Sequence, residues 1–164
     1  MEISKELQDA MNDQLNFELY SGYIYLSMAA YFEEILLDGM AHWMRIQAKE
    51  EYAHAERFWK HIAERGGRVM LAPIAGPKTE WASPLEAWTD AYNHELEVTK
   101  RINKIGEIAE KESDRAAMVF LNWFYDEQVE EEEQTLKVVD LLKKIGDSTQ
   151  ALFMLNAQLG HREG

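Results

Sequence analysis

Five glutamates fall inside the apolar stripes of the long helix-forming segments of this chain, where acidic side chains are unusual. The stripes follow from a rotation of about 100° per residue along a helix. The five are Glu18 in residues 4–37, Glu51 in 39–65, Glu95 in 84–112, and Glu127 and Glu131 in 114–145, with Glu130 on the edge of the last stripe. Each of these four segments would therefore carry a carboxylate into a bundle core.

A metal ion is the simplest compensation for several carboxylates in one core. Burial and mutual repulsion both raise carboxylate pKa values and cost several kcal/mol, and the four stripes offer almost no Lys or Arg as partners. The Glu51-x-x-His54 spacing puts an imidazole one helical turn from a carboxylate, so that both can reach one ion. Glutamate oxygens with one imidazole suit iron or manganese. Carboxylates supplied by every helix of a bundle are the pattern of a di-metal site.

Two simpler explanations of these acids are open at this point. The run of four glutamates at 130–133 is typical of a solvated face, yet four consecutive residues sweep about 300° of a helix, so one or two must face the core. The other explanation is a structural bundle that tolerates buried acids. Glu18, Glu51 and Glu95 lie far from the ends of their segments, where a side chain cannot extend to solvent. This placement favours the metal site.

The sparse Pro and Gly residues divide the chain into the elements that must position these side chains. They predict four long helices at about 4–37, 39–65, 84–112 and 114–145 and a short fifth helix at 148–159. A tight turn at Leu37-Asp38-Gly39 makes the first two helices antiparallel. Residues 66–83 are long enough to run the length of a bundle, and Ser83-Pro84-Leu85-Glu86 is a capping box. We predict an all-α four-helix bundle with a long crossover after the second helix and a short C-terminal helix, in one domain spanning 1–164.

The composition excludes several other classes of function. The 164 residues contain 17 Lys and Arg against 30 Asp and Glu, a net charge of −13, so the chain would repel nucleic-acid phosphates and attract cations. The absence of cysteine excludes thiolate metal sites and cysteine nucleophiles. No segment has the roughly 18 apolar residues that span a bilayer, and the first residues lack the pattern of a signal peptide. We expect a cytoplasmic protein with no nucleic-acid and no membrane partner.

Four segments together resemble the prokaryotic, haem-free ferritins over nearly the whole chain. They are Asn16-Phe17-Glu18-Leu19-Tyr20 with Tyr25, Glu50-Glu51-Tyr52-Ala53-His54, His94-Glu95, and Glu127-Gln128-Val129-Glu130-Glu131. The resemblance implies a ferritin-like bundle with a ferroxidase centre. Its iron site A would use Glu18, Glu51 and His54, its site B would use Glu51, Glu95 and Glu131, and a third iron site would use Glu50, Glu127, Glu130 and Glu131. Glu51 would bridge sites A and B, and Tyr25 and Gln128 would flank them.

The same resemblance implies an activity and a set of partners. Fe(II) would be oxidised to Fe(III) by dioxygen or hydrogen peroxide, and the ferric mineral would be stored inside a homo-oligomeric shell, usually of 24 subunits. Tyr20, Tyr23, Tyr31 and Val129 face away from the bundle centre on the helical pattern, and a subunit interface would explain such outward apolar positions.

The relatives of the ferritins differ from this chain at specific positions. Bacterioferritins and rubrerythrins carry a second Glu-x-x-His where this chain has Glu127-x-x-Glu130. No haem is expected, because Tyr52 stands where bacterioferritins have the haem-ligating Met. The alternative is a di-iron oxidase or peroxidase of the rubrerythrin type that stores no iron. The other histidines do not share a stripe with the acids at the right height, and we expect none of them to be a ligand: His42, His61, His94 and His161.

Overall fold

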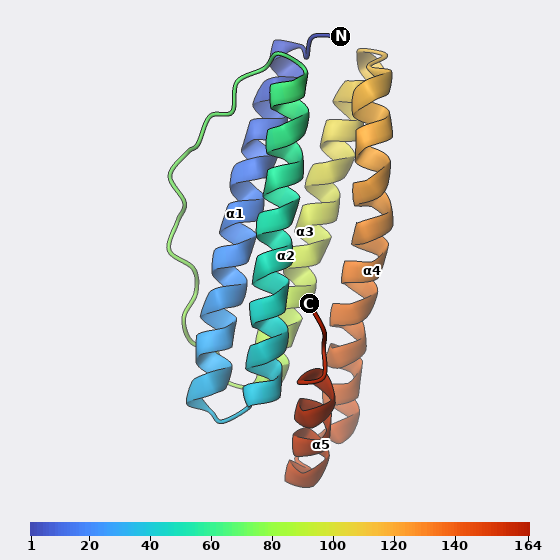
Figure 1. The fold of residues 1–164 in the computed structure, drawn as a ribbon. Helices are drawn as coiled ribbons and strands as arrows, with labels where there is room; N and C mark the ends of the chain where they lie inside the picture. Colours follow the sequence, from blue (N-terminus) through green and yellow to red (C-terminus); the bar gives the residue numbers. More distant parts are fainter.

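The computed structural model describes all 164 residues, and every regular element in it is a helix (Figure 1). The helices are α1 (Lys5–Glu34), α2 (Asp38–Glu64), α3 (Pro84–Lys111), α4 (Arg115–Ile145) and α5 (Thr149–Leu159). The first four form a bundle, and α5 is a short helix at the end of α4 (Figure 1). The predicted all-α fold with a short C-terminal helix is confirmed.

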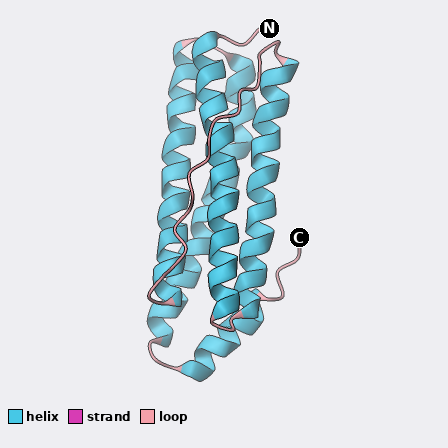
Figure 2. Cartoon of the chain, turned by 90° about the vertical axis from the view of Figure 1, so that its left-hand side faces the viewer, coloured by secondary structure: helices cyan, strands magenta, loops and turns pink.

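The connection between α2 and α3 determines the topology of the bundle. α1 and α2 form one antiparallel hairpin, and α3 and α4 form another. Residues 65–83 leave one end of α2, run along the outside of the bundle and reach the other end, where α3 begins (Figures 1 and 2). α2 and α3 therefore run in the same direction, as the predicted crossover requires.

Side-chain caps set the start of four of the five helices. Each capping oxygen accepts a hydrogen bond from the backbone amide three residues further on, which satisfies one of the free N–H groups of the first turn. The capping residues are Ser4, Ser83, Asp114 and Ser148. At the other end of α4, Gly146 has φ = 57°, a conformation that glycine adopts without strain. The observed bounds lie within one residue of the predicted ones for α2 to α5, and for α3, α4 and α5 these local caps account for the agreement at the helix starts.

The turn between α1 and α2 differs from the predicted one. α1 ends at Glu34 rather than at residue 37, and the chain reverses through residues 35–37, with Leu36 at φ = 62°. Gly39, predicted in the turn, instead lies in the first turn of α2. A Cβ there would stand 1.8 Å from the carbonyl oxygen of Asn156 on α5. In sequence, a glycine indicates a chain reversal or a close backbone approach equally well, and here it permits the approach of α5.

Amide side chains on α1 hold the crossover in place. Gln8, Asn12 and Asn16 are spaced four residues apart, so they lie in one row along the helix. They exchange hydrogen bonds of 2.7 to 3.0 Å with backbone N–H and C=O groups of alternate residues between 68 and 72. These side chains satisfy backbone groups of an extended segment that pairs with no other strand.

The core consists of two apolar clusters with a polar layer between them. One cluster lies toward the α1–α2 turn and includes Phe32 and Trp88, and the other lies toward the opposite end and includes Leu7 and Phe58. The buried polar residues of the bundle middle belong to neither cluster. They include Gln14, Glu18, Gln47, Glu51, His54, Glu95, Gln128 and Glu131. Such a layer in an interior is costly unless its groups have partners.

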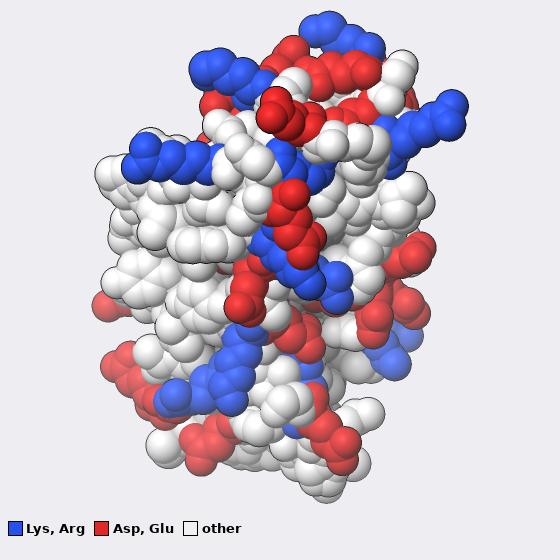
Figure 3. Space-filling view, turned by 45° about the horizontal axis from the view of Figure 1, so that its top comes forward, with Lys and Arg blue, Asp and Glu red and all other residues white.

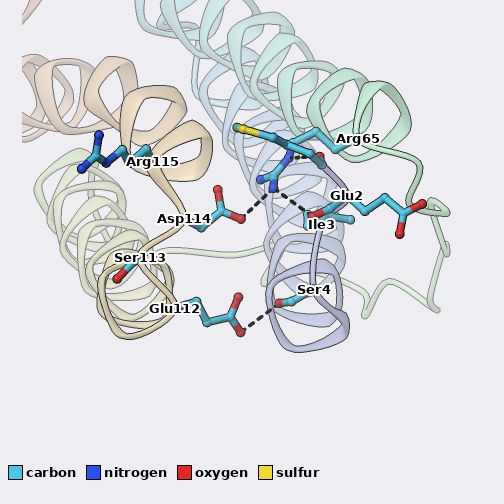
Figure 4. Close-up of a pocket in the computed structure, with 9 residues that line it drawn as sticks. Glu2, Ile3, Ser4, Arg65, Glu112, Ser113, Asp114 and Arg115 are labelled. Atoms are coloured by element: carbon cyan, nitrogen blue, oxygen red, sulfur yellow. Dashed lines mark hydrogen bonds and ion pairs between the residues drawn. The ribbon is translucent and has the colours of Figure 1, made fainter.

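At the end of the bundle where the chain begins, Arg65 connects the N-terminal residues to the turn between α3 and α4 (Figure 4). Its guanidinium donates to the carbonyl oxygens of Met1 and Glu2, both at 3.2 Å, and to Asp114 Oδ2 at 2.7 Å. A cavity of about 450 Å³ lies beside these contacts. None of the predicted site residues lines this cavity. The contacts of Arg65 beside it hold together the N-terminal residues, α2 and the α3–α4 turn.

The surface carries charges of both signs, and Figure 3 shows Lys and Arg interspersed with Asp and Glu over one face. Tyr23 and Val129 are exposed, in agreement with their predicted outward positions. Tyr31 is buried instead, because the crossover outside the bundle places Trp81 against it, with ring centroids 5.3 Å apart. No subunit contact is needed to explain this position. None of the five helices combines the length and the apolar composition that crossing a membrane would need.

Candidate metal centre

Residues from all four bundle helices meet in the polar layer. Glu18 on α1, Glu51 and His54 on α2, Glu95 on α3 and Glu131 on α4 are each at most 3% exposed. Their ligand atoms, with one from Glu127, fall into three groups of three, and within each group the atoms lie within 4.8 Å of one another. The structure thus brings together the acids whose positions on the helical stripes predicted a shared site.

The first group consists of Glu18, Glu51 and His54. His54 Nδ1 lies 3.2 Å from Glu51 Oε2 and 3.8 Å from Glu18 Oε2. The Glu51 and His54 side chains are neighbours because they are separated by one helical turn. On the opposite side, Gln14 Nε2 donates to Glu18 Oε1 at 3.0 Å. This group is the one that the ferritin resemblance assigned to iron site A.

The second group consists of Glu51, Glu95 and Glu131. Tyr25 Oη donates a hydrogen bond to Glu95 Oε1, and Gln128 Nε2 donates to Glu95 Oε2 at 3.2 Å. Glu51 is a member of both groups, so its carboxylate lies between them. This is the arrangement that a ligand bridging two ions requires.

Two glutamines that the apolar stripes did not predict, Gln14 and Gln47, orient the carboxylates. Gln47 Nε2 donates to both Glu51 Oε1 and Glu131 Oε2, each at 2.8 Å, and so links α2 to α4. Gln14 stands four residues before Glu18, as Gln47 stands four residues before Glu51. A polar amide one turn before a buried carboxylate, repeated on two helices, is the signal that could have revealed them.

Burial dominates the protonation of three of the acids. Burial raises the pKa of Glu51 well above its ordinary value, and the charge of Glu95 adds to the effect. The same two causes raise the pKa of Glu131. Burial also raises the pKa of Glu95 to about 7, although hydrogen bonds from Tyr25 and Gln128 oppose the rise. These acids therefore hold protons near neutral pH when no cation is present.

His54 provides the positive charge of the cluster. Burial opposes its protonation, but the close carboxylates of Glu127, Glu18 and Glu51 outweigh burial and raise the pKa of His54 above its ordinary value. Burial likewise disfavours the charged form of Glu18, yet the contact with His54 lowers its pKa overall. The imidazolium thus lies among the acids, and a metal ion that binds to His54 would release the proton of its ring, because an imidazole binds metal only when deprotonated.

The cluster has unused ligand atoms of the kind a cation would take. Glu18 Oε2 and Glu131 Oε1 are fully buried and have no hydrogen-bond partner. A buried carboxylate oxygen without a partner is costly, and a hard cation with oxygen and imidazole ligands removes that cost. The donor set of glutamates with one histidine, distributed over two groups that share Glu51, fits a pair of iron ions.

The residues proposed for a third site are not assembled in the same way. Glu127 is partly exposed and lies near His54 and Glu131, with His54 Nε2 3.7 Å from Glu127 Oε1. Glu130 is exposed and accepts a hydrogen bond from Gln134. Glu50 is partly exposed and is paired with Arg162. Of the four predicted residues, Glu127 and Glu131 therefore lie together in the cluster. Glu50 and Glu130 have partners outside it.

His94, expected to lie outside the ligand set, forms part of the wall around Tyr25. Its Nε2 lies 2.7 Å from Ser21 Oγ, and its ring stands edge-on to that of Tyr25 with centroids 6.2 Å apart. Burial lowers the pKa of His94 to about 4, so the ring is neutral at neutral pH. Burial raises the pKa of Tyr25 well above its ordinary value, which keeps the phenol protonated and able to donate to Glu95.

A four-helix bundle whose core holds carboxylates and a histidine from every helix belongs to the class of di-metal carboxylate bundles. The family model described as ferritin-like domain matches residues 8–145 of this chain. The chain therefore belongs to the ferritin family, and within it to the prokaryotic, haem-free type.

Individual relatives agree with this assignment over almost the full length of the chain. A bacterial non-heme ferritin of Staphylococcus aureus (strain USA300) is 39% identical over 98% of this chain and 96% of its own length. Another, of Staphylococcus haemolyticus (strain JCSC1435), is 40% identical with the same coverage. Among solved structures, an open pore ferritin of the archaeon Archaeoglobus fulgidus superposes with a TM-score of 0.97 at 46% identity, covering 98% of this chain and 99% of that one.

Proposed function

We propose that this protein stores iron, and that each chain oxidises Fe(II) to Fe(III) at a pair of sites in its bundle core. The observation that supports the proposal most strongly is the sharing of Glu51 between two groups of buried ligand atoms. The unpartnered oxygens Glu18 Oε2 and Glu131 Oε1 support it further. In this proposal iron is the substrate and the cargo of the protein rather than a resident cofactor.

The residues divide between the two sites as follows. Glu18 and His54 would bind one Fe(II) ion, Glu95 and Glu131 would bind the other, and Glu51 would bridge them. Each Fe(II) gives up one electron, and the two electrons reduce dioxygen, with two protons, to hydrogen peroxide, or reduce hydrogen peroxide, with two protons, to two waters. Holding both ions on one bridging carboxylate lets a single oxidant take both electrons, which is a positioning effect.

The protein also manages the protons that accompany binding. Burial raises the pKa of Glu51 and that of Glu131 well above the ordinary value, and His54 is protonated among its acidic neighbours. These groups release protons as Fe(II) binds. Tyr25 and Gln128 keep Glu95 turned toward the second site through their hydrogen bonds.

Storage requires an assembly. The proposal therefore includes a homo-oligomeric shell whose interior receives the ferric product, and the resemblance to ferritins implies 24 subunits. The exposed Tyr23 and Val129 support it as positions for subunit contacts. A third iron site at Glu50, Glu127 and Glu130, with Glu131 shared, belongs to the same proposal. The proposed function also includes a cytoplasmic location.

Mixing the purified protein with Fe(II) in air and following ferric absorbance tests the proposal. We expect oxidation faster than autoxidation, a particle of several hundred kilodaltons, and retention of ferric iron by that particle. Glu51→Gln should reduce the rate to that of autoxidation, whereas Glu56→Gln, at an exposed position on the same helix, should leave it unchanged. Fast oxidation by a dimer that retains no iron would instead support the rubrerythrin-type alternative.

A further inference from the structure

The C-terminal residues fold back from α5 along α2 toward the middle of the bundle (Figure 1). The carbonyl oxygen of Arg162 lies 2.8 Å from His42 Nε2. Gly164 packs so closely on Ile46 that a Cβ would stand 2.5 Å from its side chain. Between the tail and α4 a cavity of about 330 Å³ remains, with Lys137 in its lining. The tail, residues 160–164, is thus in contact with α2 but has space beside it.

Arg162 makes the most extensive contacts of the tail. Its Nη1 donates to the carbonyl oxygen of Trp43 at 3.2 Å, and its guanidinium carbon lies 4.1 Å from the Trp43 ring centroid. Its Nη2 donates to Glu50 Oε2 at 2.8 Å. The Arg162 side chain is only 14% exposed, so it is held by a stacking contact as well as by the ion pair.

Glu50 connects this contact to the metal centre. It directly precedes Glu51, and its charge contributes to the raised pKa of Glu131. A cation that used Glu50 would have to compete with the guanidinium for the same carboxylate, because Arg162 already supplies a positive charge at Oε2. Arg162 of the tail and a cation beside the metal centre would therefore compete for the carboxylate of Glu50.

We propose that the C-terminal tail is a strap whose Arg162 competes with a cation for Glu50, and thereby controls the filling of a third site beside the two central ones. The proposal rests on the proposed function for the existence of those central sites. While the strap is in place, the third site lacks one of its carboxylates. Binding of a third cation draws Glu50 away from Arg162 and removes one of the contacts that hold the tail, and return of Arg162 to Glu50 weakens the binding of the cation.

Anaerobic calorimetric titration of the full-length assembled protein with Fe(II) tests the strap. We expect two tightly bound ions per chain and a weaker third one in the unmodified protein. Arg162→Gln should tighten the third ion by a factor on the order of five, the worth of one partly exposed ion pair, and leave the first two unchanged. The matched control is Lys137→Gln, which removes a positive charge from the same cavity without breaking a contact to Glu50. Equal third affinities in both variants, or no third ion in either, would overturn the proposal.

Hydrogen exchange of the C-terminal peptide provides a second readout that needs no variant. In the unmodified protein, backbone protection in residues 160–164 should persist through two equivalents of Fe(II) per chain and decrease with the third. A third ion that binds while the tail stays protected would contradict the strap and leave the proposed function intact. If the unmodified protein binds no Fe(II) tightly, the proposed function fails and the strap with it.

Discussion

Replacing Glu95 by glutamine should stabilise the metal-free protein at alkaline pH and at the same time weaken its binding of Fe(II). The side chain is almost fully buried, and it is surrounded by other acids. Glutamine has nearly the same shape and carries no charge. The substitution therefore isolates the electrostatic cost of the carboxylate from the packing of the site.

The magnitude follows from the pKa of Glu95. Burial raises it to about 7, compared with an ordinary value of 4.5. Below pH 4.5 the carboxyl is protonated in both the folded and the unfolded chain, so burying it carries no electrostatic cost. Between pH 4.5 and about 7 the unfolded chain has released the proton whereas the folded chain keeps it, so stability is lost at about 1.4 kcal/mol per pH unit. The full cost above pH 7 is about 3 kcal/mol.

Part of this gain is offset in the variant. Tyr25 and Gln128 each donate to one oxygen of Glu95, and the amide nitrogen of glutamine cannot accept a hydrogen bond, so one of the two bonds is lost at a cost of about 1 kcal/mol. We therefore expect Glu95→Gln to raise the free energy of unfolding by about 2 kcal/mol at pH 8. For a chain of this length that corresponds to an increase in Tm of about 4–8 °C.

The assay is thermal unfolding of chelator-treated protein at pH 8 and at pH 5, at one protein concentration because assembly also shifts Tm. The control is Glu107→Gln, an exposed position on the same helix, which should change Tm little at either pH. The gain from Glu95→Gln should be present at pH 8 and nearly absent at pH 5. A variant that is less stable than the control at pH 8, or a gain independent of pH, would refute the reasoning.

Three further predictions follow from the site and the fold. Fe(II) affinity measured anaerobically should fall as pH decreases below about 7, because Fe(II) must displace the proton that Glu95 holds there; constant affinity between pH 6 and 8 would contradict this. Gln47→Leu should weaken Fe(II) binding about 10- to 100-fold, as loss of a residue that orients two ligands does, and a change below twofold would count against that role. Asn16→Ala removes two hydrogen bonds to the crossover and should cost about 1–3 kcal/mol by chemical denaturation, with faster proteolysis near residues 70–72; unchanged stability would contradict the positioning role of the amide row.

The helices could be predicted because their signals are local. Caps such as Ser83 and Gly146 act on backbone groups within one turn, and the apolar stripes follow the helical period. Gly39 shows the limit of this reasoning. Its role depends on Asn156, more than a hundred residues away, and nothing in the neighbouring residues distinguishes that contact from a turn.

The glutamates of the candidate site could be predicted because their positions on the apolar stripes showed that they would be buried. Glu18, Glu51 and Glu95 lie in apolar stripes, and the bundle brings such positions together. Gln47 was missed because an amide in a stripe carries no charge that demands explanation. The pairing of Glu50 with Arg162 could not be predicted at all, because it depends on how the tail folds back over α2.

Crystals equilibrated with Fe(II) without oxygen, measured by anomalous diffraction at the iron absorption edge, test the central proposal most directly. We predict two strong anomalous peaks in each subunit, one among Glu18, Glu51 and His54 and one among Glu51, Glu95 and Glu131. Iron peaks confined to surface carboxylates, with the bundle core empty, would contradict the assignment of these buried acids to a shared pair of ions.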